Sequence, residues 1–137
     1  MEWKSEYSLG IKEIDAQHKK LLGSFTAIEN AINLKQGWSG THYCIIELKE
    51  LALMHFAFEE AIMRLFGYSE TEEHSINHRN FMRRLEDIVN KSIRHSADAE
   101  MLVFLKKWLT EHINGSDKDY ARFILSGASV VRADEPE

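Results

Sequence analysis

The chain is 137 residues long, with a formal net charge of −5, one cysteine and one proline. This length suits one domain whose core is large enough to fold without disulfides, and the dispersed lysines and arginines argue against binding to nucleic acid or to an anionic membrane surface. No stretch approaches about 18 consecutive apolar residues, and residues 1–4 hold no apolar leader, so we expect neither membrane insertion nor secretion. The lone Cys44 fits a reducing compartment, which predicts a cytoplasmic protein.

Apolar side chains recur at helical spacing along most of the chain. An irregular arm at residues 1–10 comes first, with enough apolar side chains to dock on a core. The pattern then predicts four long helices, over residues 12–36, 40–66, 70–94 and 97–114. A short turn or helix is expected at about 118–125, and residues 127–137 are predicted to form a flexible tail.

Glycines and serines mark the predicted helix ends. Gly37, Gly67 and Gly115 follow three of the helices, and Ser39 and Ser69 are N-cap candidates for the second and third. Short connections favour antiparallel neighbours, so we expect an all-α fold. The predicted architecture is an antiparallel up-down-up-down four-helix bundle with an N-terminal arm and a short C-terminal helix, forming a single domain over residues 1–137.

Two pairs of polar side chains interrupt the apolar faces of the second and third helices. His55 and Glu59 are four residues apart, as are His74 and His78, and residues four apart on a helix differ by only about 40° in direction. One such pair alone is most often a solvated face. Each pair here continues an apolar stripe, however, and a carboxylate on a core face costs several kcal/mol unless it is compensated. A buried cation beside Glu59 is therefore the simpler explanation.

Three more residues complete the candidate set. His18 and His112 continue the inner faces of the first and fourth helices, where a lone histidine is more often a hydrogen-bonded core residue than a ligand. Asp117 follows His112 by five residues, about 140° away on a regular α-helix. It can face the same centre only if the helix ends near Gly115 and the chain turns back. The remaining histidines, His42 and His95, fall outside this pattern and are expected at the surface.

Five imidazoles and two carboxylates suffice for two metal ions. If Glu59 and Asp117 each bridge the ions together with one hydroxide or oxide, then one ion takes three histidines and the other takes two, which leaves one open coordination position. Imidazole and carboxylate suit Fe, Zn, Cu or Ni, so the ligand types do not select the metal. Because the set holds fewer anionic ligands than the Glu-x-x-His di-iron bundles, we expect reversible dioxygen binding rather than cleavage of the O–O bond.

Four phrases of the chain resemble the hemerythrin family, specifically its bacterial single-domain members. They are Gly10-Ile11-x-x-Ile14-Asp15-x-Gln17-His18, His55-Phe-x-Phe-Glu59-Glu60, His74-x-x-x-His78-x-x-Phe81 and Trp108-Leu109-x-x-His112-Ile113-x-x-x-Asp117-x-x-Tyr120. With Trp3 the resemblance covers about residues 3–125, and all seven metal positions of the family pattern are filled. One departure is Tyr68-Ser69, where bacterial members often have Tyr-Pro.

The resemblance implies a role for each residue. His74, His78 and His112 would bind one iron, His18 and His55 would bind the iron with the open position, and Glu59 and Asp117 would bridge them with an oxo or hydroxo group. An apolar O2 pocket would be lined by Leu21, Phe56, Trp108, Leu109 and Ile113, residues that could equally be ordinary bundle core. Gln17 and Tyr120 would orient the ligands by hydrogen bonds.

The function expected from these features is reversible binding of dioxygen for storage, transport or delivery, without enzymatic activity. The expected partners are dioxygen and an unidentified O2-recipient protein. The first alternative is a sensor of O2 or redox state, for which the tail at 127–137 is the only obvious handle. The second is a di-iron enzyme acting on peroxide or nitric oxide, which needs an acid or base near the open iron. The expected pocket residues offer no such group.

Overall fold

The computed structural model describes the backbone of residues 1–92 and 96–134, and the side chains of residues 1–92 and 96–127. After a short 3-10 turn, η1 (Ser5–Tyr7), the long helices are α1 (Lys12–Asn33), α2 (Gly37–Leu65) and α3 (Thr71–Ser92). The fourth side of the bundle is built from α4 (Asp98–Trp108), the π-helix η2 (Leu109–Ser116) and α5 (Asp117–Asp134). The described residues contain no β-strand, which confirms the predicted all-α fold.

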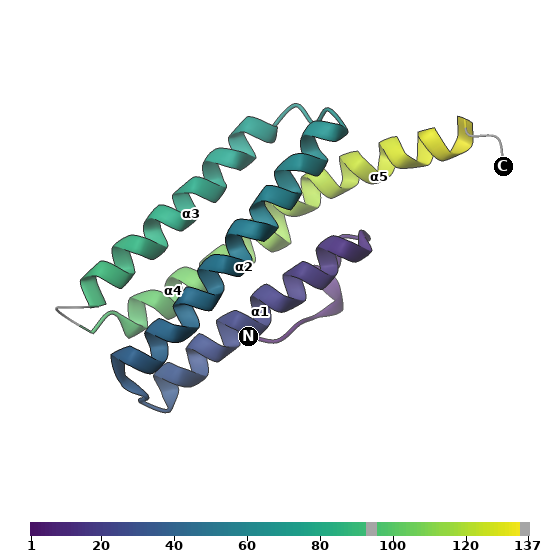
Figure 1. The fold of residues 1–137 in the computed structure, drawn as a ribbon. Coiled ribbons are helices and arrows are strands. Elements are labelled where there is room, and N and C mark those ends of the chain that lie inside the picture. Colours follow the sequence, from purple (N-terminus) through teal and green to yellow (C-terminus); the bar gives the residue numbers. More distant parts are fainter. Residues whose placement is uncertain (93–95, 135–137) are drawn as a thin grey trace.

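The helices surround one another in chain order. α1 packs against α2, α2 against α3, α3 against α4, and α4 against α1, which closes the four-helix bundle (Figure 1). The tight connection between α1 and α2 passes through Gly37, and the one after α2 passes through Gly67. Both glycines have φ near +75°, in the left-handed region that other residues seldom adopt (φ +79° and +71°). These reversals make successive helices antiparallel neighbours.

Two predicted helix caps are wrong. α2 begins at Gly37, so Ser39 lies inside the helix rather than before it. α3 begins at Thr71, so Ser69 belongs to the preceding turn. The hydroxyl of Thr71 donates a hydrogen bond to the Tyr68 carbonyl at 2.6 Å and secures the turn that Ser69 was expected to cap.

The C-terminal third differs most from the prediction. The helix does not end near Gly115, because that glycine has no positive φ and the chain passes from α4 through η2 into α5 without a turn. The C-terminal helix predicted at 118–125 is present but longer, since α5 spans Asp117–Asp134 (Figure 1). Residues 127–134 thus continue α5, residues 135–137 lie outside the described residues, and the flexibility of the tail predicted at 127–137 stays a prediction. Gly127 is the only glycine after Asp117, and one helical glycine costs only about 1 kcal/mol relative to alanine.

Two apolar clusters occupy the bundle interior. The larger cluster fills the half that includes Phe25, Leu48, Leu85 and Leu105. The smaller cluster joins Leu9, Ile14, Met63, Tyr120, Ala121 and Ile124. The N-terminal arm docks as expected: Trp3 and Tyr7 pack on the larger cluster and Leu9 is buried in the smaller one.

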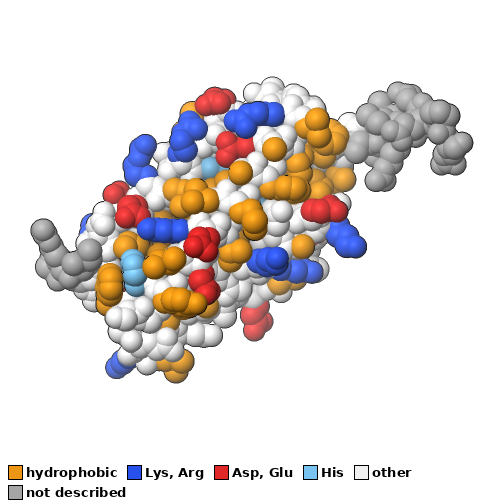
Figure 2. Space-filling model, in the orientation of Figure 1, with side chains coloured by type: hydrophobic (Ala, Val, Ile, Leu, Met, Phe, Trp, Pro, Cys, Tyr) orange, Lys and Arg blue, Asp and Glu red, His pale blue; other side chains and the backbone are white. Residues whose placement is uncertain are grey.

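The surface mixes charged and apolar side chains. On the face drawn in Figure 2, lysines and arginines alternate with acidic residues rather than forming a basic patch. Among the described residues, no helix combines the length and the apolar character needed to cross a membrane.

Candidate metal centre

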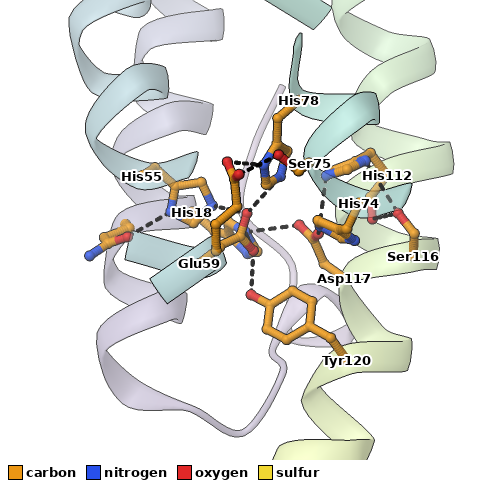
Figure 3. Close-up of polar contacts among 12 residues, drawn as sticks. His18, His55, Glu59, His74, Ser75, His78, His112, Ser116, Asp117 and Tyr120 are labelled. Carbon is orange, nitrogen blue, oxygen red and sulfur yellow. Dashed lines mark hydrogen bonds and ion pairs between the residues drawn. The ribbon is translucent and has the colours of Figure 1, made fainter. Parts of the chain in front are cut away.

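The structure brings all seven candidate ligands into one buried cluster. His18 comes from α1, His55 and Glu59 from α2, His74 and His78 from α3, His112 from η2 and Asp117 from the start of α5, so every side of the bundle contributes (Figure 3). Each of the seven residues is at most 5% exposed. Helical phase predicted that these residues lie on inner faces, and the structure also brings them to one level of the bundle.

The π-helix explains how Asp117 reaches the cluster. In a π-helix each amide bonds to the carbonyl five residues earlier, so residues five apart lie much closer in direction than they do on an α-helix. His112 and Asp117 have this spacing across η2, and His112 Nε2 lies 3.1 Å from Asp117 Oδ1. The prediction that Asp117 requires a broken helix is wrong, because a change of helix type achieves the same result without a break.

The inward-facing atoms of the cluster lie close together without forming hydrogen bonds. His74 Nε2 is 2.8 Å from Asp117 Oδ1, and His55 Nε2 and His78 Nε2 are 3.1 and 3.2 Å from Glu59 Oε1. His18 Nε2 lies 3.2 Å from Asp117 Oδ2. Among the described residues, all five Nε2 atoms, Glu59 Oε1 and both Asp117 carboxylate oxygens lack a hydrogen-bond partner.

This spacing fits metal ligation. Two donors about 2.1 Å from one ion and at right angles to each other are about 3 Å apart. Buried polar atoms are almost always hydrogen-bonded, so eight unpartnered atoms converging on one place require another partner. Metal ions satisfy imidazole nitrogens and carboxylate oxygens at the same time.

The donor atoms form two overlapping groups. One group contains three histidines, His74, His78 and His112, and the other contains two, His18 and His55. Glu59 and Asp117 belong to both groups, and the donor atoms within each group lie within 4.8 Å of one another. The cluster can therefore hold two neighbouring cations that share two carboxylates.

The electrostatics keep both carboxylates ionised. Burial and the charge of Asp117 act to raise the pKa of Glu59, but His55 and His78 outweigh them and hold that pKa below its ordinary value. Burial likewise acts to raise the pKa of Asp117, and its histidine neighbours, His112 first, hold it well below the usual range. Glu59 and Asp117 are thus anionic at neutral pH, as metal ligation requires.

Tyr120 supports Glu59 from the smaller apolar cluster. The phenol is fully buried and its hydroxyl donates a hydrogen bond to Glu59 Oε2. Burial, followed by the charges of Glu59 and Asp117, raises the pKa of Tyr120, so the hydroxyl keeps its proton. The predicted contact between Tyr120 and the ligands is thereby present in the structure.

Three histidines have a partner on the ring nitrogen that faces away from the cluster. Gln17 Oε1 lies 2.6 Å from His55 Nδ1, which identifies the contact expected of Gln17. Glu60 Oε2 lies 3.1 Å from His78 Nδ1, and Ser116 Oγ lies 3.2 Å from His112 Nδ1. Such contacts fix ring orientation and tautomer.

Sequence reasoning gave no role to Glu60 and Ser116. Glu60 is one residue from Glu59, about 100° around the helix, so its partner lies on the neighbouring α3 and no pattern within α2 reveals it. The hydroxyl of Ser75 also donates to Glu60 and holds it in place. Ser116 lies four residues after His112. This spacing would have predicted their contact if the helix had been expected to continue past Gly115.

The five residues expected to line an O2 pocket lie together beside the cluster. Leu21, Phe56, Leu109 and Ile113 are buried and Trp108 is partly buried, all within the larger apolar cluster. The Phe56 ring stacks on His78 at 3.9 Å between ring centroids, and the Trp108 ring stacks on His112 at 4.5 Å. Aromatic rings thus cover one side of the histidine cluster.

Of the two histidines set aside from the sequence, His42 does not join the cluster. It stacks on the exposed Trp38 in the first turns of α2, where it is partly buried rather than fully exposed. His95 lies outside the described residues.

Comparison with known proteins gives a consistent result. The model of the hemerythrin HHE cation-binding domain matches residues 9–124. A bacteriohemerythrin of Clostridium acetobutylicum is 33% identical over 86% of this chain and 96% of its own length. A bacteriohemerythrin of Pseudomonas paraeruginosa is 29% identical over 98% of this chain and 88% of its own, and a hemerythrin-like protein of Naegleria gruberi is 31% identical over 86% and 88%. The chain belongs to the hemerythrin family, whose members bind metal and dioxygen.

Proposed function

We propose that this protein binds dioxygen reversibly at a non-haem di-iron centre and serves in O2 storage, transport or delivery. The observation that carries the proposal is the unequal division of the histidines. One donor group has three imidazoles and the other has two, while both share the same carboxylates. With one further shared oxygen, an oxo or hydroxo bridge, six-coordinate ions would leave one position open on one side only.

The proposed ligand set follows the two groups. His74, His78 and His112 would hold one iron, His18 and His55 would hold the other, and Glu59 and Asp117 would bridge them. Two iron(II) ions would supply the two electrons that reversible uptake of O2 requires.

The remaining residues would control the surroundings of the open position. Gln17 would fix the imidazole of His55 through their 2.6 Å contact. The apolar side chains of Leu21, Phe56, Trp108, Leu109 and Ile113 would exclude water, which slows the charge separation that leads to irreversible oxidation. These five side chains hold no carboxyl or imidazole that could act as a proton donor, which favours a carrier over an enzyme.

The proposal includes a cytoplasmic location and delivery to an O2-recipient protein. The lone Cys44 supports a reducing compartment. A carrier needs no signalling output, whereas a sensor would have to transmit the change at the centre to a partner.

Two histidine variants test the division of the ligands. His55→Ala should abolish O2 binding while leaving the iron held by His74, His78 and His112, whereas His74→Ala should release that iron. Iron content and O2 uptake of the two purified variants are the measurements. Equal loss of iron in both variants would show that the open position has been assigned to the wrong group.

A further inference from the structure

A small polar cavity lies on the outer side of the proposed centre. It has a volume of about 160 Å³ and is lined by Tyr68, Glu70, Glu73, His74, Asn77, Ser116 and Asp119. Its three carboxylates come from different elements: Glu70 precedes α3, Glu73 lies in its first turn, and Asp119 lies in the first turn of α5. All three are exposed, so the cavity presents negative charge to solvent.

All three carboxylates act on the same side chain, Tyr68. The Tyr68 hydroxyl donates a hydrogen bond to Glu70 Oε2 at 3.1 Å. Burial, the Glu70 contact and the charges of Asp119 and Glu73 raise the pKa of Tyr68 to about 12. Among the described residues, Glu70 and Glu73 form no ion pair, and Asp119 has only the exposed Arg122 at 3.8 Å.

The inner wall of this cavity is a candidate ligand. The His74 imidazole lines the cavity, yet its side chain is only 4% exposed. Its Nε2 atom has no hydrogen-bond partner among the described residues and lies 2.8 Å from Asp117 Oδ1, inside the cluster. Ser116, whose hydroxyl contacts His112 (Figure 3), lines the same cavity. His74 therefore separates the acidic cavity from the centre.

Two other cavities reach a candidate ligand, but neither has a lining of net negative charge. The cavity of about 800 Å³ between α3 and α4 reaches His112, and its two basic residues, Arg84 and Lys107, are balanced by Glu100 and Glu111. The cavity beside His78 is lined by two arginines, Arg64 and Arg79, and by one carboxylate, Glu60. The cavity at His74 is lined by three carboxylates and by no lysine or arginine. Of these three routes, it alone has a lining of net negative charge, which favours the approach of a cation.

We propose that the cavity at His74 is the entry site through which divalent metal ions, Fe2+ in the cell, load the centre. Its carboxylates draw the hydrated cation from solvent, because clefts of one charge raise the local concentration of the opposite ion and its association rate. The imidazole of His74 is then the first ligand of the centre that the ion meets. This inference rests on the proposed function, since it concerns how that centre is filled.

The rate of metal uptake tests the inference without using O2 chemistry. Full-length metal-free protein is mixed anaerobically with cobalt(II), and the growth of the cobalt absorption bands gives the second-order rate constant. Glu73→Gln combined with Asp119→Asn should lower that constant about fivefold or more at low ionic strength, and high salt should reduce the difference. Both proteins should still take up two cobalt ions per chain. Glu70→Gln, which is farther from the ligands in sequence, should also slow uptake.

The matched control removes the same charges elsewhere. Glu72→Gln combined with Asp87→Asn changes one glutamate and one aspartate on α3, both exposed and outside the cavity. Glu72 lies in the same first helical turn as Glu73 but faces Arg79 at 3.6 Å. The control should load within about twofold of the unmodified rate.

The outcomes separate the two proposals. If the cavity and control variants load equally fast while the unmodified protein takes up two cobalt ions, the entry site is wrong and the centre stands. If the unmodified protein takes up fewer than two cobalt ions at saturation, the proposed centre fails and the entry site fails with it. Circular dichroism of the metal-free variants should be unchanged, so slow uptake would not reflect unfolding.

Discussion

On the two-histidine side of the cluster, the outer ring nitrogen of His55 contacts the neutral amide of Gln17. Gln17 Oε1 lies 2.6 Å from His55 Nδ1, so it favours the tautomer whose Nε2 lone pair faces the cluster. On the three-histidine side, His78 has the carboxylate of Glu60 instead. The neutral amide of Gln17 polarises its imidazole less than the negatively charged carboxylate of Glu60 does.

Replacing Gln17 should therefore weaken the binding of one metal ion more than that of the other. Gln17→Leu removes the hydrogen bond and should lower the affinity for the more weakly held ion about tenfold or more, because contacts of this kind contribute that much to metal binding. Stepwise titration with a chelator measures both affinities. The control is Gln36→Leu, at an exposed position before α2 with no side-chain cap bond. Unchanged affinities in Gln17→Leu would show that the contact does not orient His55.

The sequence could predict which side chains converge on the cluster. It could not predict every residue that contacts the outward-facing nitrogen of a histidine ring. His18, His55, Glu59, His74 and His78 each continue an apolar helical stripe, and burial of a stripe is set by sequence periodicity. The partners Glu60 and Ser116 depend on how an imidazole ring is turned and on which residues the neighbouring helix brings near. Those features are decided by packing between helices, which a single stripe does not encode.

At the scale of elements, η2 is the feature on which the cluster depends. The stretch Leu109–Ser116 is π-helical, and this brings Asp117 closer in direction to His112 than an α-helix would. Periodicity could predict a helix here. It could also predict that His112 and Asp117, five residues apart, would not face the same centre on a regular α-helix. It could not distinguish a broken helix from a π-helix, because both relieve the conflict. The entry cavity was equally hidden, since Glu70, Glu73 and Asp119 meet only after α3 and α5 are packed.

Substitution at Gly115 distinguishes the two explanations. A Cβ at this position would meet the Thr110 carbonyl oxygen at 3.8 Å, an ordinary contact, and the φ of Gly115 is not positive. Gly115→Ala should therefore raise the free energy of unfolding by roughly 0.5–1 kcal/mol, since alanine loses less backbone entropy on folding.

Gly67 provides the contrasting case. It also has room for a Cβ, but its φ is +71°. Gly67→Ala should lower the free energy of unfolding by about 1 kcal/mol. Urea titration of the metal-free proteins measures both values. A destabilised Gly115→Ala would indicate that the chain turns at this glycine after all.

At the scale of the whole molecule, protons compete with metal ions for the cluster. Burial acts to lower the pKa of His18 and of His112, but the charge of Asp117 beside each outweighs it and raises both pKa values above 6.5. A raised pKa means that the imidazole is still protonated at pH values where an ordinary histidine is neutral. Because metal binding requires the neutral ring, each proton must leave first.

The apparent metal affinity should therefore fall as the pH is lowered from about 8 to about 6. The slope of log affinity against pH should approach one proton or more per ion at the lower end. Competition with a chelator of known proton affinity gives this slope. A flat profile over that range would show that His18 and His112 do not release protons when the metal binds. They would then not be ligands.

The most direct test of the proposed function is the optical spectrum of the iron-loaded protein during cycles of oxygenation. The anaerobic di-iron(II) protein should develop an O2-dependent visible band at a stoichiometry of one O2 per two irons. The band should disappear on degassing and return when O2 is readmitted. A band that forms once and never bleaches, or iron that oxidises without taking up O2, would contradict reversible dioxygen binding at this centre.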